Sequence, residues 1–232
     1  GWVSDMGQMQ DPAKWPSELK TKWKVEEGEG YATPIVAEGA IYQHARQGDD
    51  EVLLCLDLET GQTRWRKSYP VAFKMGGGAA MHGKGPKANA IYADGRVFTF
   101  SINGILSAWD AENGDLLWRR DRSKQFERTH PYWGACTSPI VDEDRVVVAY
   151  GNDKAGVLVA HDVATGNVVW EHGDDGASYS SPIVTELQGV RQVIYWNLRA
   201  LIGVESKSGK LLWEQPFEHE GTNQNMPTPI IW

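Results

Sequence analysis

A segment of eleven residues recurs four times along this chain, and its spacing constrains the fold more than any other feature. Each copy has a small residue first, an acidic residue third, glycine seventh and tryptophan eleventh. The glycines are Gly61, Gly114, Gly166 and Gly209, so successive copies lie 53, 52 and 43 residues apart. Periods of this length are typical of four-stranded β-propeller blades rather than helical solenoids.

Every position of the segment has a physical reason. Glycine reaches the positive φ that a tight hairpin turn needs, and the preceding acid accepts N–H bonds from that turn. The tryptophan is expected to bury its ring between blades while its N–H finds a carbonyl. We expect the small first residue to form the seat for a neighbouring blade's tryptophan. The docking tryptophans are Trp23 (on a lone outer strand without the rest of the segment), Trp65, Trp118, Trp170 and Trp213.

A second pattern precedes each segment, because a Thr-Pro or Ser-Pro pair opens an apolar stretch. The pairs begin at Thr33, Ser138, Ser181 and Thr228, whereas Asn89-Ala90 stands there in the second blade. Proline fits the start of a strand, where no ladder donor is needed. In the first blade we predict strands over 33–37, 40–44, 51–56 and 62–68, with a loop over 45–50. No window has a sustained helical period, so almost no helix is expected.

These segments resemble the tryptophan-docking motifs of the pyrroloquinoline-quinone-type (quinoprotein-like) β-propeller repeat family. The resemblance covers about residues 15–232. Members of that family include quinoprotein alcohol dehydrogenases, the propeller lipoprotein of the outer-membrane barrel-assembly machinery and uncharacterised exported bacterial proteins. The motif itself is structural, so it indicates the fold more than the function.

The predicted fold is an all-β propeller of four-stranded antiparallel blades. Residues 1–27 form an N-terminal segment with a lone outer strand, and 218–232 the first strand of an incomplete blade. The four blades between them are 28–70, 71–123, 124–174 and 175–217. The resemblance implies a ring of seven or eight blades, so we expect four blades of a larger ring, which a second copy could complete. Unpaired strand edges would otherwise favour aggregation.

Loops leading into the first strand of each blade, and loops joining its second and third strands, should gather at one mouth of the central channel. Aromatic, amide and cationic side chains there form a candidate site for a protein, peptide or small ligand. The alternative is that they only pack and cap the loops. The candidates are Tyr31, His82, His130, Tyr132, Trp133, Tyr179, Arg199, Asn223 and Asn225.

No catalytic residue and no metal ligand is assigned. The six histidines show no paired ligand spacing, and the acidic pairs are typical of solvated turns. Gly76-Gly77-Gly78 lacks the phosphate-loop pattern and predicts a flexible loop. Cys55 and Cys136 are too few for a disulfide framework, although one bridge stays open.

Composition excludes some partners. The formal net charge of −8 disfavours nucleic acid and anionic lipid. No stretch approaches about 20 apolar residues, so no membrane span is predicted. The N-terminus lacks the zones of a signal peptide, as a processed exported protein also would.

Three functions are consistent with the resemblance. The favoured one is a non-catalytic binding scaffold of the bacterial cell envelope, periplasmic or secreted, with a protein or peptide partner and no cofactor. The first alternative is an alcohol or sugar dehydrogenase that uses pyrroloquinoline quinone and calcium. Such enzymes have an adjacent cysteine pair, a stacking tryptophan and a calcium site beside a catalytic aspartate, whereas the two cysteines here lie 81 positions apart.

In that dehydrogenase alternative, Trp133 is the stacking candidate, and Asp174 or Asp175 the base candidate. The second alternative is a carbohydrate-binding propeller that stacks sugars on aromatic rings. Its candidate rings are Tyr31, Tyr132, Trp133 and Tyr179.

Overall fold

The computed structural model describes residues 17–122, 124–126, 130–217 and 225–231. The described chain forms four antiparallel sheets, each with four strands in sequence order. The all-β prediction and the four-stranded blade are therefore confirmed.

The strands of the four sheets have the following bounds. The first contains β1 (Ile35–Ala37), β2 (Ala40–Gln47), β3 (Asp50–Asp57) and β4 (Thr63–Pro70). The second contains β5 (Ile91–Ala93), β6 (Arg96–Phe100), β7 (Ile105–Asp110) and β8 (Leu116–Asp121). The third contains β9 (Ile140–Asp142), β10 (Arg145–Gly151), β11 (Gly156–Asp162) and β12 (Val168–His172). The fourth contains β13 (Ile183–Leu187), β14 (Val190–Trp196), β15 (Ala200–Glu205) and β16 (Leu211–Pro216).

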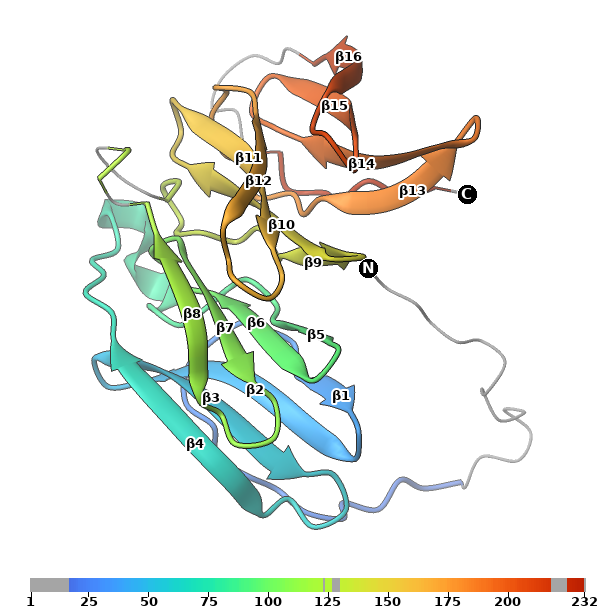
Figure 1. Cartoon of the computed structure of the whole chain (residues 1–232). Coiled ribbons are helices and arrows are strands. Elements are labelled where there is room, and N and C mark those ends of the chain that lie inside the picture. Colours follow the sequence, from blue (N-terminus) through green and yellow to red (C-terminus); the bar gives the residue numbers. More distant parts are fainter. Residues whose placement is uncertain (1–16, 123, 127–129, 218–224, 232) are drawn as a thin grey trace.

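The four sheets fan out as blades, so that their short first strands β1, β5, β9 and β13 lie along one inner side (Figure 1). The last strands β4, β8, β12 and β16 lie outermost. Middle strands such as β3, β10 and β11 are buried along most of their length. Neighbouring blades cover both faces of β10 and β11, whereas β3 is covered by the second blade and by the segment that carries Trp23 and Val25. The hydrophobic core therefore lies between blades.

The first blade differs from the expected strand bounds at one hairpin. The predicted loop over 45–50 is replaced by a turn at Gly48-Asp49, and β2 and β3 pair as far as Gln47↔Asp50. Arg46 falls in the predicted loop but lies in β2, and its side chain is only 3% exposed. Its guanidinium donates to the carbonyl oxygens of Asp49 and Val71, which compensates part of its burial.

The glycine run also differs from the expected flexible loop. It leads into a short 3₁₀ helix, η3 (Gly77–His82), in which the Ala79 N–H donates to the Gly76 carbonyl at 2.9 Å. A Cβ at Gly76 would lie 2.9 Å from the Tyr132 ring. Glycine at this position therefore allows the loop of the second blade to pack against the loop of the third.

The docking tryptophans pack on the turn glycines of the next copy of the motif. A Cβ added to Gly61, Gly114, Gly166 or Gly209 would lie 2.6–2.7 Å from the rings of Trp23, Trp65, Trp118 and Trp170, respectively. Each indole N–H donates to a carbonyl of the same turn, at 2.9–3.1 Å; the acceptors are Leu58, Ala111, Val163 and Ser206. All four rings thus bond a carbonyl, but only Trp118 and Trp170 are buried between blades, and Trp23 and Trp65 are half-buried. Trp213 is also half-buried and donates instead to the Gln192 side chain of its own blade.

The prediction that the small first residue of the motif seats the tryptophan of a neighbouring blade is wrong. The small first residue does not hold the neighbour's ring, because it lies opposite the tryptophan of its own blade on the adjacent strand. The pairs are Cys55↔Trp65, Ala108↔Trp118, Ala160↔Trp170 and Gly203↔Trp213, and the register shifts directly after each. A Cβ on Gly203 would lie 2.3 Å from the Trp213 ring, so a small residue leaves room for the ring across the strand.

The acid of each motif shapes the turn as predicted. The Asp57 carboxylate accepts the N–H groups of Glu59 and Thr60 at 3.1 and 2.9 Å. Hydrogen bonds from the side chains of Arg64 and Thr60 lower the pKa of Asp57 to about 2. The φ of the turn glycine is +70° at Gly61, a conformation that a side chain disfavours.

A chain of hydrogen bonds links the blades along the inner side. In each blade, the residue two positions before the inner strand donates its backbone N–H to the side chain of the equivalent residue in the next blade. These bonds run from Thr33 to Asn89 (2.8 Å), to Ser138 (2.9 Å), to Ser181 (3.0 Å) and to Thr228 (3.3 Å). Asn89 replaces Thr or Ser in the second blade and still supplies the acceptor oxygen.

The two flanking segments have no ladder pairing among the described residues. Trp23 makes its docking contact from an irregular segment, and residues 225–231 carry no strand assignment. A β-strand needs a hydrogen-bonded neighbour, and the described chain offers neither segment one. The rest of the expected terminal strand, 218–224, lies outside the described residues, as does residue 232.

Exchanging two glycines for alanine should separate backbone strain from the docking contact. Gly166 and Gly173 have φ of +70° and +78°, but only Gly166 faces a ring, since nothing lies within 4 Å of a Cβ at Gly173. We expect Gly173→Ala to lower the free energy of unfolding by about 1 kcal/mol. Gly166→Ala should lower it by roughly 2–4 kcal/mol, because Trp118 must also move.

Urea denaturation followed by tryptophan fluorescence measures both variants. Equal losses for the two would show that the ring contact at Gly166 contributes nothing beyond the backbone term.

His161 is a buried, uncharged member of the third blade. Its Nε2 lies 2.9 Å from the Tyr150 hydroxyl, and its Nδ1 lies 2.9 Å from the Gly166 carbonyl oxygen. Burial lowers the pKa of His161 to about 4, from an ordinary value of 6.5. The structural role expected for this histidine agrees with its position inside the docking motif.

Stability should therefore fall when the pH is lowered from 6.5 towards 4. In that window the unfolded chain binds a proton at His161 and the folded protein does not, so acid favours unfolding. The free energy of unfolding falls by about 3 kcal/mol over the whole window.

Urea midpoints across this window should fall less steeply in His161→Gln than in the wild type. The matched variant His172→Gln, at a half-buried position, should keep the wild-type slope; identical slopes in all three would contradict the assignment.

Candidate functional site

A cavity of about 590 Å³ opens on the inner side of the blades, beside the starts of the inner strands. We call it the channel-mouth cavity. All four loops that lead into inner strands contribute to it, together with the segment after β16. Its lining residues are Tyr31, Thr33, His82, Lys87, Asn89, Trp133, Cys136, Ser138, Tyr179 and Met226.

Trp133 stands at the centre of the aromatic wall. The rings of His82 and Tyr132 meet it edge to face, with centroids 4.9 and 5.2 Å away. Its backbone N–H donates to the Tyr179 hydroxyl at 3.2 Å, which ties the loops of the third and fourth blades. The indole Nε1 is shielded from solvent, and no group of the described chain accepts its hydrogen. The wall is therefore rigid and retains an unused donor.

Lys87 brings a positive charge to this wall. Its Nζ lies 4.4 Å from the centre of the Tyr31 ring and 3.4 Å from the His82 carbonyl oxygen. Burial lowers the pKa of Lys87 from its ordinary value. No aspartate or glutamate is among the described residues that line the cavity.

The cavity offers no activated nucleophile. Burial raises the pKa of Cys136 to about 12, so this thiol stays protonated near neutral pH. Its Sγ donates to the Gly134 carbonyl at 3.4 Å. The Ser138 hydroxyl accepts the Asn89 N–H as part of the inner hydrogen-bond chain. This arrangement can hold a ligand, but it does not assemble a base beside a nucleophile.

Four of the nine sequence candidates line the cavity: Tyr31, His82, Trp133 and Tyr179. Tyr132 supports the wall from outside the lining, because it contacts Trp133 while its N–H donates to Asp153. His130 packs on the Phe73 ring at 4.7 Å, and neither residue is in the lining.

The remaining three candidates are not brought into the cavity. Arg199 pairs with Asp175 at 2.7 Å, outside the lining. Asn225 is buried and donates through Nδ2 to the Asn197 and Leu198 carbonyls, which anchors the segment after β16 to the fourth blade. Asn223 lies outside the described residues.

Sequence reasoning missed six lining residues: Thr33, Lys87, Asn89, Cys136, Ser138 and Met226. A signal was present for three of them. Thr33, Asn89 and Ser138 hold the same polar position before an inner strand, and a position repeated in every blade must face the same side. No repeat marks Lys87 or Met226, which come from loops that differ in every blade.

The quinone alternative can be tested against this cavity. Calcium and a base need carboxylates, but none lines it, and no group of three metal-ligating residues occurs among the described residues. Asp175 is held by Arg199, and Cys55 and Cys136 are free thiols. The described residues do not fit a quinone with its calcium, so no reaction step is derived through them.

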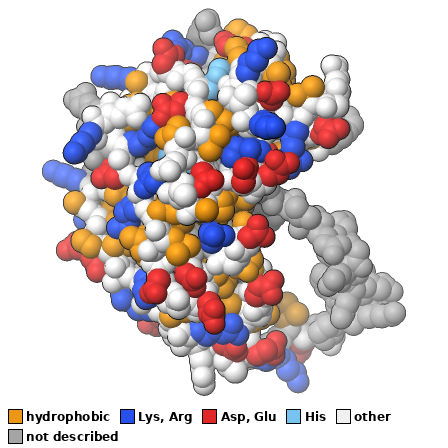
Figure 2. Space-filling view, in the orientation of Figure 1, with side chains coloured by type: hydrophobic (Ala, Val, Ile, Leu, Met, Phe, Trp, Pro, Cys, Tyr) orange, Lys and Arg blue, Asp and Glu red, His pale blue; other side chains and the backbone are white. Residues whose placement is uncertain are grey.

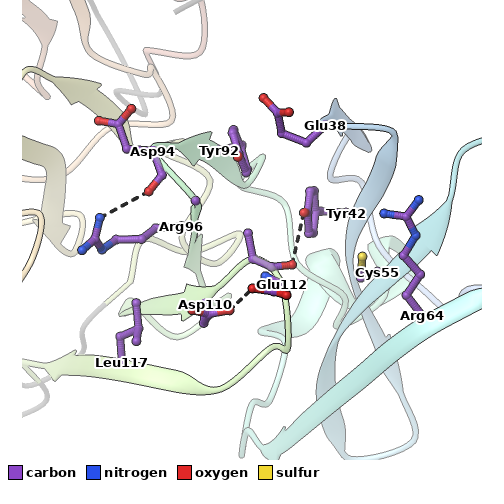
Figure 3. A pocket seen from close by; sticks show the side chains of 12 residues that line it. Glu38, Tyr42, Cys55, Arg64, Tyr92, Asp94, Arg96, Asp110, Glu112 and Leu117 are labelled. Atoms are coloured by element: carbon purple, nitrogen blue, oxygen red, sulfur yellow. Dashed lines mark hydrogen bonds between the residues drawn. The ribbon is translucent and has the colours of Figure 1, made fainter.

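A second cavity, of about 530 Å³, lies between the first two blades at their turn ends (Figure 3). The rings of Tyr42 and Tyr92 stack there at 5.8 Å, and the Tyr42 hydroxyl donates to the Ala111 carbonyl at 3.2 Å. Burial raises the pKa of Tyr42 to about 12. Arg64 and Asp110 in its lining already serve the docking turns, so this cavity belongs to the scaffold.

The outer surface mixes both signs of charge. In Figure 2, acidic and basic side chains alternate over the visible face, with hydrophobic side chains between them. Within the described residues, no helix has the length and apolar character to cross a membrane.

Several known proteins resemble the chain. It is 30% identical to the quinohemoprotein alcohol dehydrogenase ADH-IIG of Pseudomonas putida over 72% of this chain and 22% of that enzyme. It is 26% identical to the outer membrane protein assembly factor BamB of Shewanella oneidensis, over 84% of this chain and 48% of that protein. The chain therefore spans between a fifth and a half of these relatives.

Solved structures show the same fold. The crystal structure of BamB from Moraxella catarrhalis superposes with a TM-score of 0.57 at 17% identity, over 87% of this chain and 54% of that one. A quinohemoprotein alcohol dehydrogenase from Comamonas testosteroni gives 0.58 at 18% identity, over 82% and 37%. A family model described as outer membrane protein assembly factor BamB matches residues 49–232, so the chain belongs to this family of quinoprotein-like propeller repeats.

Proposed function

We propose that this chain is part of a non-catalytic recognition propeller of the bacterial cell envelope, which binds a protein or peptide partner at the channel-mouth cavity. The observation that carries the proposal is the lining of that cavity. Every inner loop contributes to it, and aromatic rings dominate the wall without a catalytic pair.

The scaffold supports recognition because it holds these loops at fixed positions. The docking contacts fix the outer strands, and the inner hydrogen-bond chain fixes the residues two positions before β1, β5, β9 and β13. Ligand sites commonly lie on variable loops that a rigid scaffold positions. A partner would therefore meet a surface that needs little reordering, which reduces the entropy lost on binding.

The place in the envelope and the kind of partner are supported by the family. The family description and the name of the Shewanella oneidensis relative both refer to outer membrane protein assembly, a process in which proteins bind one another. We extend this to the present chain as a periplasmic or secreted scaffold that needs no cofactor. That a second copy completes the ring stays a prediction.

The dehydrogenase alternative is the weaker one at this cavity, because no carboxylate of the described lining could bind calcium or act as a base. The carbohydrate alternative draws on the Tyr31 ring, which is 60% exposed, but Lys87 already covers one face of that ring.

Photo-crosslinking inside the cell tests the proposed surface. A benzoylphenylalanine in place of Tyr31 should give a discrete adduct with one envelope protein, because this side chain projects at the cavity rim. The same probe in place of Leu212, which is 38% exposed on the outer strand β16, is the matched control and should give none.

Equal adducts at both positions, or none at Tyr31, would contradict recognition at the channel mouth. Dye reduction with alcohols after adding pyrroloquinoline quinone and calcium to the purified full-length protein should stay at background; turnover would favour the dehydrogenase instead.

A further inference from the structure

We infer that the channel-mouth cavity captures a carboxylate group of a peptide segment against Lys87, with the adjoining apolar side chain held on the Trp133 wall. The inference rests on the proposed function and names the chemistry of the partner. It is carried by the charge of the cavity and by the size and composition of its lining.

The charge of the cavity is opposite to that of the chain. The chain has 31 acidic residues and a net charge of −8, yet none of the described lining residues is aspartate or glutamate. Lys87 is the one lysine or arginine in that lining. Within the described residues no carboxylate oxygen lies within 4.0 Å of its Nζ, whereas the shielded guanidinium groups of Arg122 and Arg145 have such partners. An anionic ligand therefore complements this cavity, and a cationic one does not.

The position of Lys87 suits a single carboxylate. Its ammonium group rests over the Tyr31 ring and reaches only the His82 carbonyl, at a long 3.4 Å. A half-buried cation without a counter-charge has lost part of its hydration without compensation. A carboxylate at hydrogen-bond distance would restore that interaction as a charge-assisted bond, which is shorter and stronger than a neutral one.

Trp133 supplies the second contact. Its ring is part of the cavity lining, whereas its Nε1 hydrogen is shielded from solvent and is therefore not presented to a ligand in the cavity. The Met226 side chain and the Tyr179 ring complete an apolar wall beside it, where an aliphatic or aromatic neighbour of the carboxylate would pack.

The size and composition of the cavity favour a peptide end or side chain over a nucleic acid. About 590 Å³ lies within the range of small-ligand cavities, so it takes one or two residues and not a duplex. Phosphate groups are usually met by several cations or by the fork of arginine, and the described lining contains neither. The negative chain would also repel a polyanion.

Fluorescence anisotropy with labelled pentapeptides on the purified full-length protein tests the inference. The probe is Gly-Ser-Gly-Glu-Phe with a free C-terminus. Three matched peptides replace Glu by Gln, the free C-terminus by an amide, or both. We expect the doubly neutral peptide to bind at least about tenfold more weakly than the probe, and the two single replacements show which carboxylate is captured.

Protein variants assign the effect to Lys87. Lys87→Met removes the charge at similar length and should weaken the probe by about tenfold while leaving the doubly neutral peptide unchanged. Lys87→Arg should largely retain binding. Lys210→Met is the matched control, because Lys210 is exposed in the turn before β16, away from the cavity. Urea denaturation confirms that each variant is folded.

The outcomes separate this inference from the proposed function. If both charged and neutral peptides bind equally and Trp133→Ala abolishes both, the channel mouth is a recognition site but carboxylate capture is wrong. If no peptide binds, or Lys87→Met and Lys210→Met behave alike, carboxylate capture is overturned. Failure of the proposed function is read separately, from the crosslinks at Tyr31 and Leu212.

Discussion

The contact between an indole ring and a turn glycine is the interaction on which the rest of this structure depends. It combines three requirements at one point: a positive φ, the absence of a Cβ and a carbonyl aimed at the indole N–H. Because the same turn provides all three, one tryptophan fixes both the distance and the orientation of the neighbouring blade. Other polar contacts also join outer strands to the next blade, such as Lys67 with Asp115 and Arg120 with the Gly166 carbonyl. The indole contact is repeated from Trp23 to Trp170, so it sets the geometry of the stack.

The inner side is organised differently, and that difference creates the cavity. Short inner strands such as β1 and β9 give little area for packing, and the blades are joined there by single hydrogen bonds between residues that precede those strands. The loops in front of these bonds are then free to vary in length without disturbing the docking contacts. The loop before β5 uses that freedom to place η3, with His82 beside Trp133.

The repeat predicted the blades and their docking turns well, because each repeated residue is under the same local constraint in every blade. Gly61, Gly114, Gly166 and Gly209 could be placed in positive-φ turns from spacing alone. The seat was misplaced because sequence cannot tell whether a small residue relieves its own tryptophan or a neighbour's; Cys55 faces Trp65 of the same blade. The loop predicted over 45–50 is wrong for a related reason, since the carbonyls that accept from the buried Arg46 guanidinium, such as that of Val71, come near it only after folding.

The candidate site was only partly predictable, because its members lie outside the repeat. Aromatic rings such as Trp133 and Tyr179 stand out by type, so the sequence could single them out. Lys87 could not be recognised, since its significance lies in what surrounds it: an acidic chain whose carboxylates are absent from one described cavity. An absence shared by loops far apart in sequence is visible only after folding. In a repeat protein, the positions that recur in every repeat thus explain the fold, and the loop residues outside the repeat determine which ligand the protein can bind.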